Sequence, residues 1–280
     1  MRRQVRFIFI IVTALVVALV AAAPAQARPV TPDRQYYLSL GDSLAFGYQP
    51  DLVAEHDVNP ADYRSYAEHF AALAHRLRLV NYGCPGETTT TLVQGGCPWP
   101  YPLHDSYGSA TSQLGAARSF LTAHPGRVSL VTIDIGSNDL LGLVGGCEAS
   151  QPTTLPACLA AGLPRTLSTI ASNYATVLAT LQPLARHARF VLFTLYNPLA
   201  LTLPGSDALI AVVNQALAGL ASAAHARLAD AFRAINGTAG SAQEKARICA
   251  LTWECTSYAN VHPTTLGYWS LTFALGRSLR

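Results

Sequence analysis

The chain has 280 residues, and its charge excludes several classes of partner. It carries 19 lysines and arginines against 16 aspartates and glutamates, and three of the arginines lie in the first six residues. The remainder is formally neutral, with Lys245 as its one lysine and no basic cluster, so it lacks the positive face that nucleic-acid binding needs. A single α/β domain of this size buries its own core, and we expect a monomer.

The first 27 residues have the pattern of a secretory signal peptide. Arginines precede an apolar run over residues 7–23, and small residues stand at Ala25 and Ala27, the two positions that signal peptidase reads. We therefore expect cleavage after Ala27, a secreted (extracellular) protein and one domain over residues 28–280. The alternative is an uncleaved membrane anchor, because the run is near the lower length limit for spanning a bilayer. After cleavage we expect no stable membrane insertion.

From residue 36 onward, strand-like and helix-like segments alternate. Short runs of β-branched, aromatic and leucine residues predict buried strands, and apolar residues at helical spacing predict helices. This order is typical of a parallel sheet with helices on both faces, so we expect an α/β protein, a three-layer α/β/α sandwich of the flavodoxin-like type. The predicted strands are 36–41, 78–82, 128–135, 189–195 and 227–232, and the predicted helices are 61–77, 111–124, 163–186, 207–224 and 264–279.

The first predicted strand ends abruptly at Gly41-Asp42-Ser43. In an open α/β sheet, ligands bind at the carboxyl ends of the strands, which is where Ser43 is expected. Three further segments each follow a predicted strand or precede a predicted helix: NYGCPGETT at 81–89, IDIGSNDLL at 133–141 and NVHPTT at 260–265. Together the four segments place serine, glycine, asparagine and histidine in that chain order.

With these four segments, the chain from about residue 36 to 270 resembles the SGNH, or GDSL, family of serine ester hydrolases. The resemblance implies that Ser43 is the nucleophile and His262 the general base. It also implies an oxyanion hole formed by the backbone N–H of Ser43, the backbone N–H of a glycine and the side-chain amide of Asn138. In the family this glycine lies five residues after an asparagine, which indicates Gly86. Gly83 is the alternative.

The sequence departs from the family at the acid that orients the histidine. That acid usually lies three residues before the histidine, and Ala259 stands there. We expect the main-chain carbonyl of Ala259 to accept the Nδ1 proton of His262 instead. The alternative is a carboxylate from elsewhere, with Glu254 and Asp230 nearest in sequence.

Six cysteines in an exported chain favour three disulfides. Sequence alone does not fix their connectivity, and we expect nearest neighbours to pair, because each pair then closes a short loop that contains glycine or proline. We expect no metal site, since there is no C-x-x-C pair and no histidine at ligand spacing. The expected pairs are Cys84 with Cys97, Cys147 with Cys158, and Cys249 with Cys255.

Loops over residues 95–107, 143–163 and 199–203 are candidate walls of a substrate cleft. The sequence lacks G-x-S-x-G, G-x-x-x-x-G-K, H-E-x-x-H and G-x-G-x-x-G, the motifs of common lipases, nucleotide hydrolases, zinc proteases and dinucleotide binding. We therefore expect a serine ester hydrolase (esterase or lipase) that forms an acyl-serine intermediate without metal or cofactor, on small-molecule or lipid esters. The alternatives are a carbohydrate acetylesterase, a phospholipase or an inactive binding module of the same fold.

Overall fold

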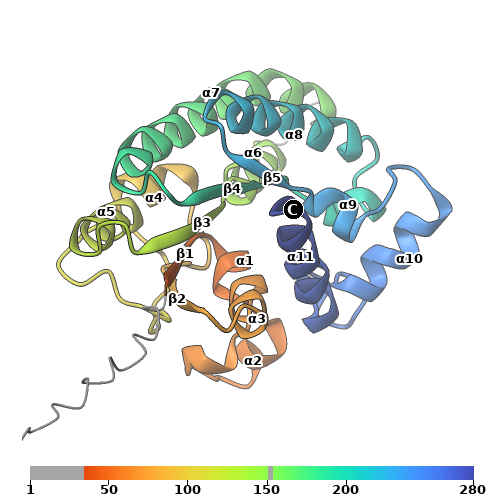
Figure 1. Cartoon of the computed structure of the whole chain (residues 1–280). Coiled ribbons are helices and arrows are strands. Elements are labelled where there is room, and N and C mark those ends of the chain that lie inside the picture. The colour runs from red at the N-terminus through yellow and green to blue at the C-terminus, as the bar shows by residue number, and fades with distance from the viewer. Residues whose placement is uncertain (1–34, 151–153) are drawn as a thin grey trace, which may run out of the picture. The chain divides into compact units, whose positions relative to one another are not determined.

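The computed structural model describes residues 35–150 and 154–280, so the expected signal peptide lies outside the described residues. The main sheet is parallel and has the strand order β2-β1-β3-β4-β5. Helices lie on both of its faces (Figure 1), which confirms the predicted α/β/α sandwich. The strands are β1 (Gln35–Gly41), β2 (Leu77–Asn81), β3 (Val128–Asp134), β4 (Arg189–Phe193) and β5 (Arg227–Ala229).

Each face of the sheet has its own hydrophobic core, because alternate side chains of a strand point to opposite faces. On one face, Leu38 and Leu40 pack against α4 (Thr89–Gln94), α5 (Gln113–Ala123), α6 (Ser137–Ala149), α7 (Leu155–Leu181) and α8 (Ser206–Ala223). On the other face, Tyr37 packs with α1 (Ser43–Phe46), α3 (Tyr66–Leu73), α9 (Ala231–Ile235), α10 (Ala242–Leu251) and α11 (Thr265–Ser278). The short helix α2 (Pro50–Ala54) follows α1.

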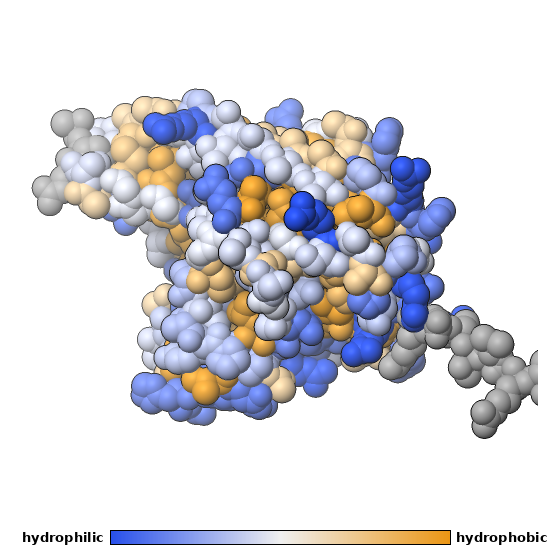
Figure 2. Space-filling model, turned by 90° about the vertical axis from the view of Figure 1, so that its left-hand side faces the viewer, coloured by the Kyte–Doolittle hydropathy of each residue, from blue (hydrophilic) through white to orange (hydrophobic). Residues whose placement is uncertain are grey.

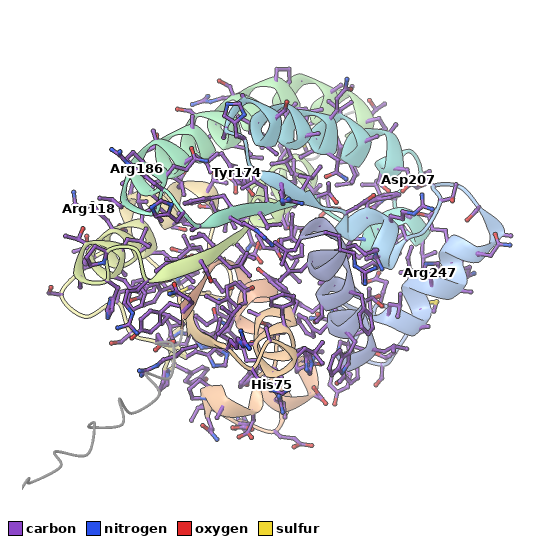
Figure 3. All side chains as sticks on the ribbon, viewed as in Figure 1. His75, Arg118, Tyr174, Arg186, Asp207 and Arg247 are labelled. Carbon is purple, nitrogen blue, oxygen red and sulfur yellow. A yellow bond between two sulfur atoms is a disulfide. The ribbon has the colours of Figure 1, made fainter. Side chains whose placement is uncertain are left out.

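Buried polar groups tie the helices to the sheet. Tyr174 of α7 donates its hydroxyl to the carbonyl oxygen of Ile135 over 2.9 Å, and its ring is fully enclosed (Figure 3). On the surface drawn in Figure 2, hydrophobic residues form separate groups among hydrophilic ones, as is ordinary for a folded domain. Most large hydrophobic side chains are instead buried in the two cores on either side of the sheet.

The helix predicted over 61–77 is shorter in the structure. Ser65 caps α3 through a capping box with Glu68, and the preceding residues Pro60–Asp62 form a separate 3-10 turn. The segment 143–163 is largely helical rather than a loop, because α6 extends to Ala149 and α7 begins at Leu155. Pro156 lies in the first turn of α7, where no intrahelical N–H is needed.

The C-terminal part of the sheet also differs from expectation. The strand predicted over 227–232 stops at Ala229, because Asp230 caps α9 and turns the chain into a helix. Helix α10 and a small antiparallel pair, β6 (Thr252–Trp253) with β7 (Asn260–Pro263), were not predicted. This pair matters for the site because it carries the histidine.

Three disulfides are present, with the connectivity expected from the sequence. Cys84–Cys97 closes the loop after β2, Cys147–Cys158 joins α6 to α7, and Cys249–Cys255 joins α10 to the segment after β6. Each closes a short loop, and such a crosslink stabilises a fold by about 2–4 kcal/mol. All three are therefore attached to segments that bear candidate site residues, namely Gly86, Asn138 and His262.

Candidate active site

The turn after β1 presents Ser43 at the carboxyl edge of the sheet. Gly41 has φ +151°, and a side chain there would have its Cβ 2.2 Å from the carbonyl oxygen of Asp134, so only glycine fits. Asp42 then caps α1 by accepting the N–H of Leu44 over 2.9 Å. Ser43 is the first residue of α1, where a backbone N–H has no acceptor within the helix.

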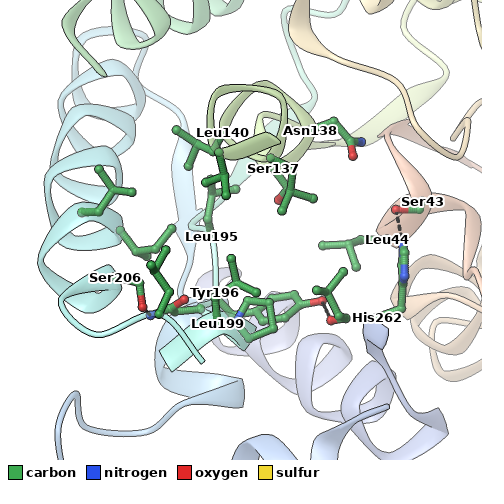
Figure 4. Close-up of a pocket in the computed structure, with 18 residues that line it drawn as sticks. Ser43, Leu44, Ser137, Asn138, Leu140, Leu195, Tyr196, Leu199, Ser206 and His262 are labelled. Carbon is green, nitrogen blue, oxygen red and sulfur yellow. Dashed lines mark hydrogen bonds between the residues drawn. The ribbon is translucent and has the colours of Figure 1, made fainter. Parts of the chain in front are cut away.

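The structure brings His262 to Ser43. The Nε2 atom of His262 lies 2.7 Å from Oγ of Ser43, across 219 residues of sequence (Figure 4). His262 is held on β7, whose residue Asn260 pairs with Trp253 of β6. The indole N–H of Trp253 donates to Oε1 of Gln49 over 2.8 Å, which fastens this pair of strands to the segment that follows Ser43.

The group at Nδ1 of His262 is not the one expected. The side-chain oxygen of Asn260 lies 2.6 Å from Nδ1, in the place where the main-chain carbonyl of Ala259 was predicted. Ala259 has a left-handed backbone with φ +42°, and the chain turns there so that the next side chain, Asn260, reaches the ring. The predicted orienting group is therefore corrected from Ala259 to Asn260.

The two carboxylates considered as alternatives lie elsewhere. Asp230 accepts the N–H of Arg233 over 2.9 Å as the cap of α9. Glu254 follows β6, and among residues 35–150 and 154–280 neither of these carboxylates hydrogen-bonds His262. An amide thus occupies the position that an acid holds in a Ser-His-Asp triad.

The surroundings of His262 favour its neutral form. The ring of Tyr48 packs on the imidazole with 4.3 Å between ring centroids. Although part of His262 remains accessible, burial of the imidazole, to which this packing contributes, lowers its pKa to about 4. A neutral imidazole is the form that accepts a proton from a serine hydroxyl.

The predicted oxyanion donors besides Ser43 come from two elements, Asn138 from α6 and Gly86 from the loop after β2. Asn138, in the first turn of α6, donates its side-chain amide to the carbonyl oxygen of Glu87 over 2.9 Å. This bond uses one of the two amide hydrogens and leaves the other for a ligand. Asn138 lines the same pocket as Ser43 and His262. The neighbouring Asp139 accepts both the N–H and the hydroxyl of Thr89, which fixes α6 against α4.

The structure separates the two candidate glycines. The N–H of Gly83 donates to the side chain of Asn81 over 2.9 Å and is therefore occupied. Gly86 has φ +83°, and a Cβ there would lie 2.9 Å from the ring of Pro98. Its backbone conformation and the lack of space both require glycine, and its N–H remains the better candidate.

Behind the loop that bears Gly86 lies a buried polar network that the sequence does not predict. The carboxyl group of Glu87 accepts the side-chain N–H of Gln113 over 2.5 Å and the hydroxyl of Tyr107 over 3.3 Å. Burial raises the pKa of Glu87 to about 8, so this group is largely protonated at neutral pH. The one available signal was that Glu87 follows Gly86 in the second segment.

An apolar pocket opens at the Ser43–His262 pair. Its cavity has a volume of about 80 Å³ and lies between α6, α8 and the segment after β4 (Figure 4). Of the three predicted walls, 199–203 contributes Leu199 and Leu203, 143–163 contributes Val144, and 95–107 contributes nothing. The other apolar lining residues are Leu44, Leu140, Leu141, Leu195, Tyr196, Pro198, Leu209, Ile210 and Val261.

The described residues form no cluster of three or more histidine, cysteine, aspartate or glutamate side chains that could hold a metal ion. What the site offers is a hydroxyl bonded to a neutral imidazole, nearby N–H donors and an apolar cavity. These are the parts that acyl transfer needs, namely a nucleophile with its base, donors for the developing oxyanion and a place for the acyl group.

Comparison with known proteins identifies the family. Residues 39–269 match the model of the GDSL-like Lipase/Acylhydrolase family, and the chain belongs to this family. By its family, it is a carboxylic ester hydrolase. No curated protein matches the chain.

Solved structures with the same fold have different substrates. Axe2, an acetylxylan esterase from Geobacillus stearothermophilus, is 17% identical with a TM-score of 0.54, over 88% of this chain and 94% of that one. The lipase Lip_vut3 from a goat rumen metagenome is 19% identical with a TM-score of 0.53, over 87% and 97%. An extracellular lipase from Streptomyces rimosus is 19% identical with a TM-score of 0.55, over 87% and 99%. At these identities the similarity shows the fold.

Proposed function

We propose that this protein is a secreted esterase or lipase that hydrolyses esters of apolar acyl groups through an acyl-Ser43 intermediate. The observation that carries the proposal is the 2.7 Å contact between Ser43 and His262 at the mouth of an apolar pocket. The reaction is ordinary acyl transfer, and every group that it needs comes from this chain.

In the proposed first step, Oγ of Ser43 attacks the ester carbonyl carbon while its proton passes to Nε2 of His262. The negative charge that develops on the carbonyl oxygen is stabilised by the N–H groups of Ser43 and Gly86 and by the amide of Asn138. The tetrahedral intermediate collapses, the C–O bond to the alcohol breaks, and His262 returns the proton to the leaving oxygen. Water then cleaves the acyl-serine ester by the same route and restores the hydroxyl.

The pocket supports an apolar acyl group rather than acetyl. Most of its lining side chains are aliphatic, and they come from α6, α8 and the segment after β4. Each methylene buried there contributes about 0.8 kcal/mol. Acetyl has no methylene to bury, so hydrolysis should rise with chain length until the pocket is filled.

Export is supported by two features. The N-terminal pattern of residues 1–27 is that of a signal peptide, and three disulfides are typical of oxidising compartments. We propose that the mature protein begins at Arg28, forms one domain and works as a monomer. Mass spectrometry of the secreted protein and light scattering test these two points.

The test of the proposed function uses p-nitrophenyl esters from acetate to palmitate. The rate should peak beyond acetate, and Ser43→Ala should abolish it. Ile210→Phe, which fills the pocket from α8, should move the peak to shorter chains, whereas Val212→Phe, on the exposed face of the same helix, should not. A peak at acetate would support a carbohydrate acetylesterase instead. Release of acyl chains from phospholipid alone would indicate a phospholipase, and no hydrolysis of any ester an inactive binding module.

A further inference from the structure

We infer that Asn260 is a positioning residue that replaces the acid of a catalytic triad with a neutral amide and thereby selects the reactive tautomer of His262. The inference begins from one atom, Oδ1 of Asn260, which contacts two groups of His262. It lies 3.1 Å from the backbone nitrogen of His262 and 2.6 Å from Nδ1 of the ring.

The contact with the backbone N–H of His262 shows which nitrogen of the imidazole carries the proton. A backbone N–H can only donate, so the atom of Asn260 that faces it has to be the amide oxygen. The same oxygen faces Nδ1 of His262, and an oxygen without hydrogens can only accept, so Nδ1 carries the ring proton. Nε2 of the neutral imidazole then has the free lone pair, directed at the hydroxyl of Ser43. This is the tautomer that a general base needs.

The amide of Asn260 is itself held in place. Asn260 pairs with Trp253 in the two-stranded β6–β7 sheet, and the Cys249–Cys255 disulfide closes the chain just before this turn. On the other side, the hydroxyl of Tyr196 donates to the carbonyl oxygen of Val261 over 2.7 Å. The residues on both sides of the amide are thus fixed to different parts of the fold.

A neutral partner has a consequence that a carboxylate lacks. Both orient the ring, but only a carboxylate gives the protonated imidazole a full opposite charge. Burial lowers the pKa of His262, and Asn260 supplies no charge to raise it again. The ionisable side chains that contact the pair or its backbone are tyrosines, which are neutral in this pH range, namely Tyr48, Tyr196 and Tyr268.

Imidazole NMR tests the positioning without any substrate. In the ¹⁵N spectrum of the full-length secreted protein, the His262 resonance is assigned by its loss in His262→Gln. We expect a protonated Nδ1 and an unprotonated Nε2 in the wild type and a mixture of tautomers in Asn260→Ala. If the His262 signals of Asn260→Ala are the same as those of the wild type, the inference is wrong. Should the alanine variant not fold, the isosteric Asn260→Leu gives the same readout.

Kinetics give a second test, which rests on the proposed ester hydrolysis. Asn260→Ala should lower kcat roughly ten- to hundredfold with little change in KM, the loss expected from one strong hydrogen bond. Asn260→Asp should keep kcat near the wild-type value, because a carboxylate also accepts the Nδ1 proton. It should move the acid limb of the pH profile to higher pH, because its negative charge raises the pKa of His262. Ser257→Asp, which adds the same charge at an exposed position of the same loop, should do neither.

The outcomes separate this inference from the proposed function. An active wild type with unchanged kcat and acid limb in both Asn260 variants overturns the inference and leaves the function intact. An inactive wild type whose Nδ1 proton depends on Asn260 leaves the inference intact and removes the function.

Discussion

Gln113 pairs with both polar backbone groups of Gly41, accepting its N–H over 2.6 Å and donating to its carbonyl oxygen over 3.0 Å. Gly41 ends the strand that presents Ser43, and the same Gln113 amide also donates to Glu87 beside Gly86. One side chain from α5 therefore links the turn that bears Ser43 to the loop that bears a predicted oxyanion donor.

We expect Gln113→Leu to lower both stability and activity. The change leaves the buried N–H of Gly41 without a partner, and one unsatisfied buried group costs about 1–3 kcal/mol. It also removes one hydrogen bond each from the Gly41 carbonyl, which keeps the N–H of Cys84, and from the Glu87 carboxyl, which keeps the hydroxyl of Tyr107. Urea denaturation measures the loss, and Gln94→Leu, at an exposed position, is the matched control. If both variants unfold at the wild-type urea concentration, the link is not a structural one.

Asn138→Ala should lower kcat by about 10²–10³ through the loss of one oxyanion donor. The wild-type amide is bonded to the carbonyl of Glu87 at the surface of the pocket and carries little of the core. The melting temperature should therefore change far less than the rate. Stopped-flow measurement of acylation checks the step affected, and a variant that acylates at the wild-type rate would remove Asn138 from the site.

Activity should persist well below the ordinary histidine range. The base is active when deprotonated, and a pKa lowered to about 4 means that His262 loses its proton at lower pH than a free histidine. The rate should be near its plateau at pH 6 and fall as pH drops through about 4. A pH profile of kcat/KM checks this, with far-UV circular dichroism at each pH to separate titration from unfolding. Half-maximal activity near 6.5 would contradict it.

Glu87 should make the protein less stable as pH rises. Its pKa is about 8 in the folded protein against an ordinary 4.5, so the folded state binds the proton more tightly than the unfolded state does. The unfolding free energy therefore falls with pH between these two values. Glu87→Gln keeps the hydrogen-bonding shape without a charge and should be more stable than the wild type at pH 8 by more than about 1 kcal/mol. The difference should disappear near pH 4.5. Burial also raises the pKa of Asp42, to about 7, and the charge of Asp42 adds to the raised pKa of Glu87.

The sequence predicts the fold through alternation, because each buried strand is a short run of apolar residues and each helix has its own periodic face. It does not predict β6 and β7, since strands of two and four residues are too short to show a period. The two prolines in 143–163 predict a loop, but Pro156 lies in the first turn of α7, where a proline is tolerated.

The sequence predicts those residues of the candidate site that lie at fixed positions within its motifs. Ser43 and His262 follow from the motifs, and the structure brings them into contact. Asn260 was overlooked because the group that reaches a histidine ring depends on the path of the backbone between them. That path is set by the left-handed turn at Ala259, which no pattern of residue types reveals. The roles of Glu87 and Gln113 were likewise hidden, because they depend on loops that meet only in the folded chain.

The hydrogen bond between Ser43 and His262 spans 219 residues, and its second partner lies near the end of the chain. While the chain is being synthesised, the hydroxyl of Ser43 is therefore present long before the imidazole that it contacts. A chain made only as far as β6 lacks this pair and, under the proposed mechanism, lacks the base that the reaction needs.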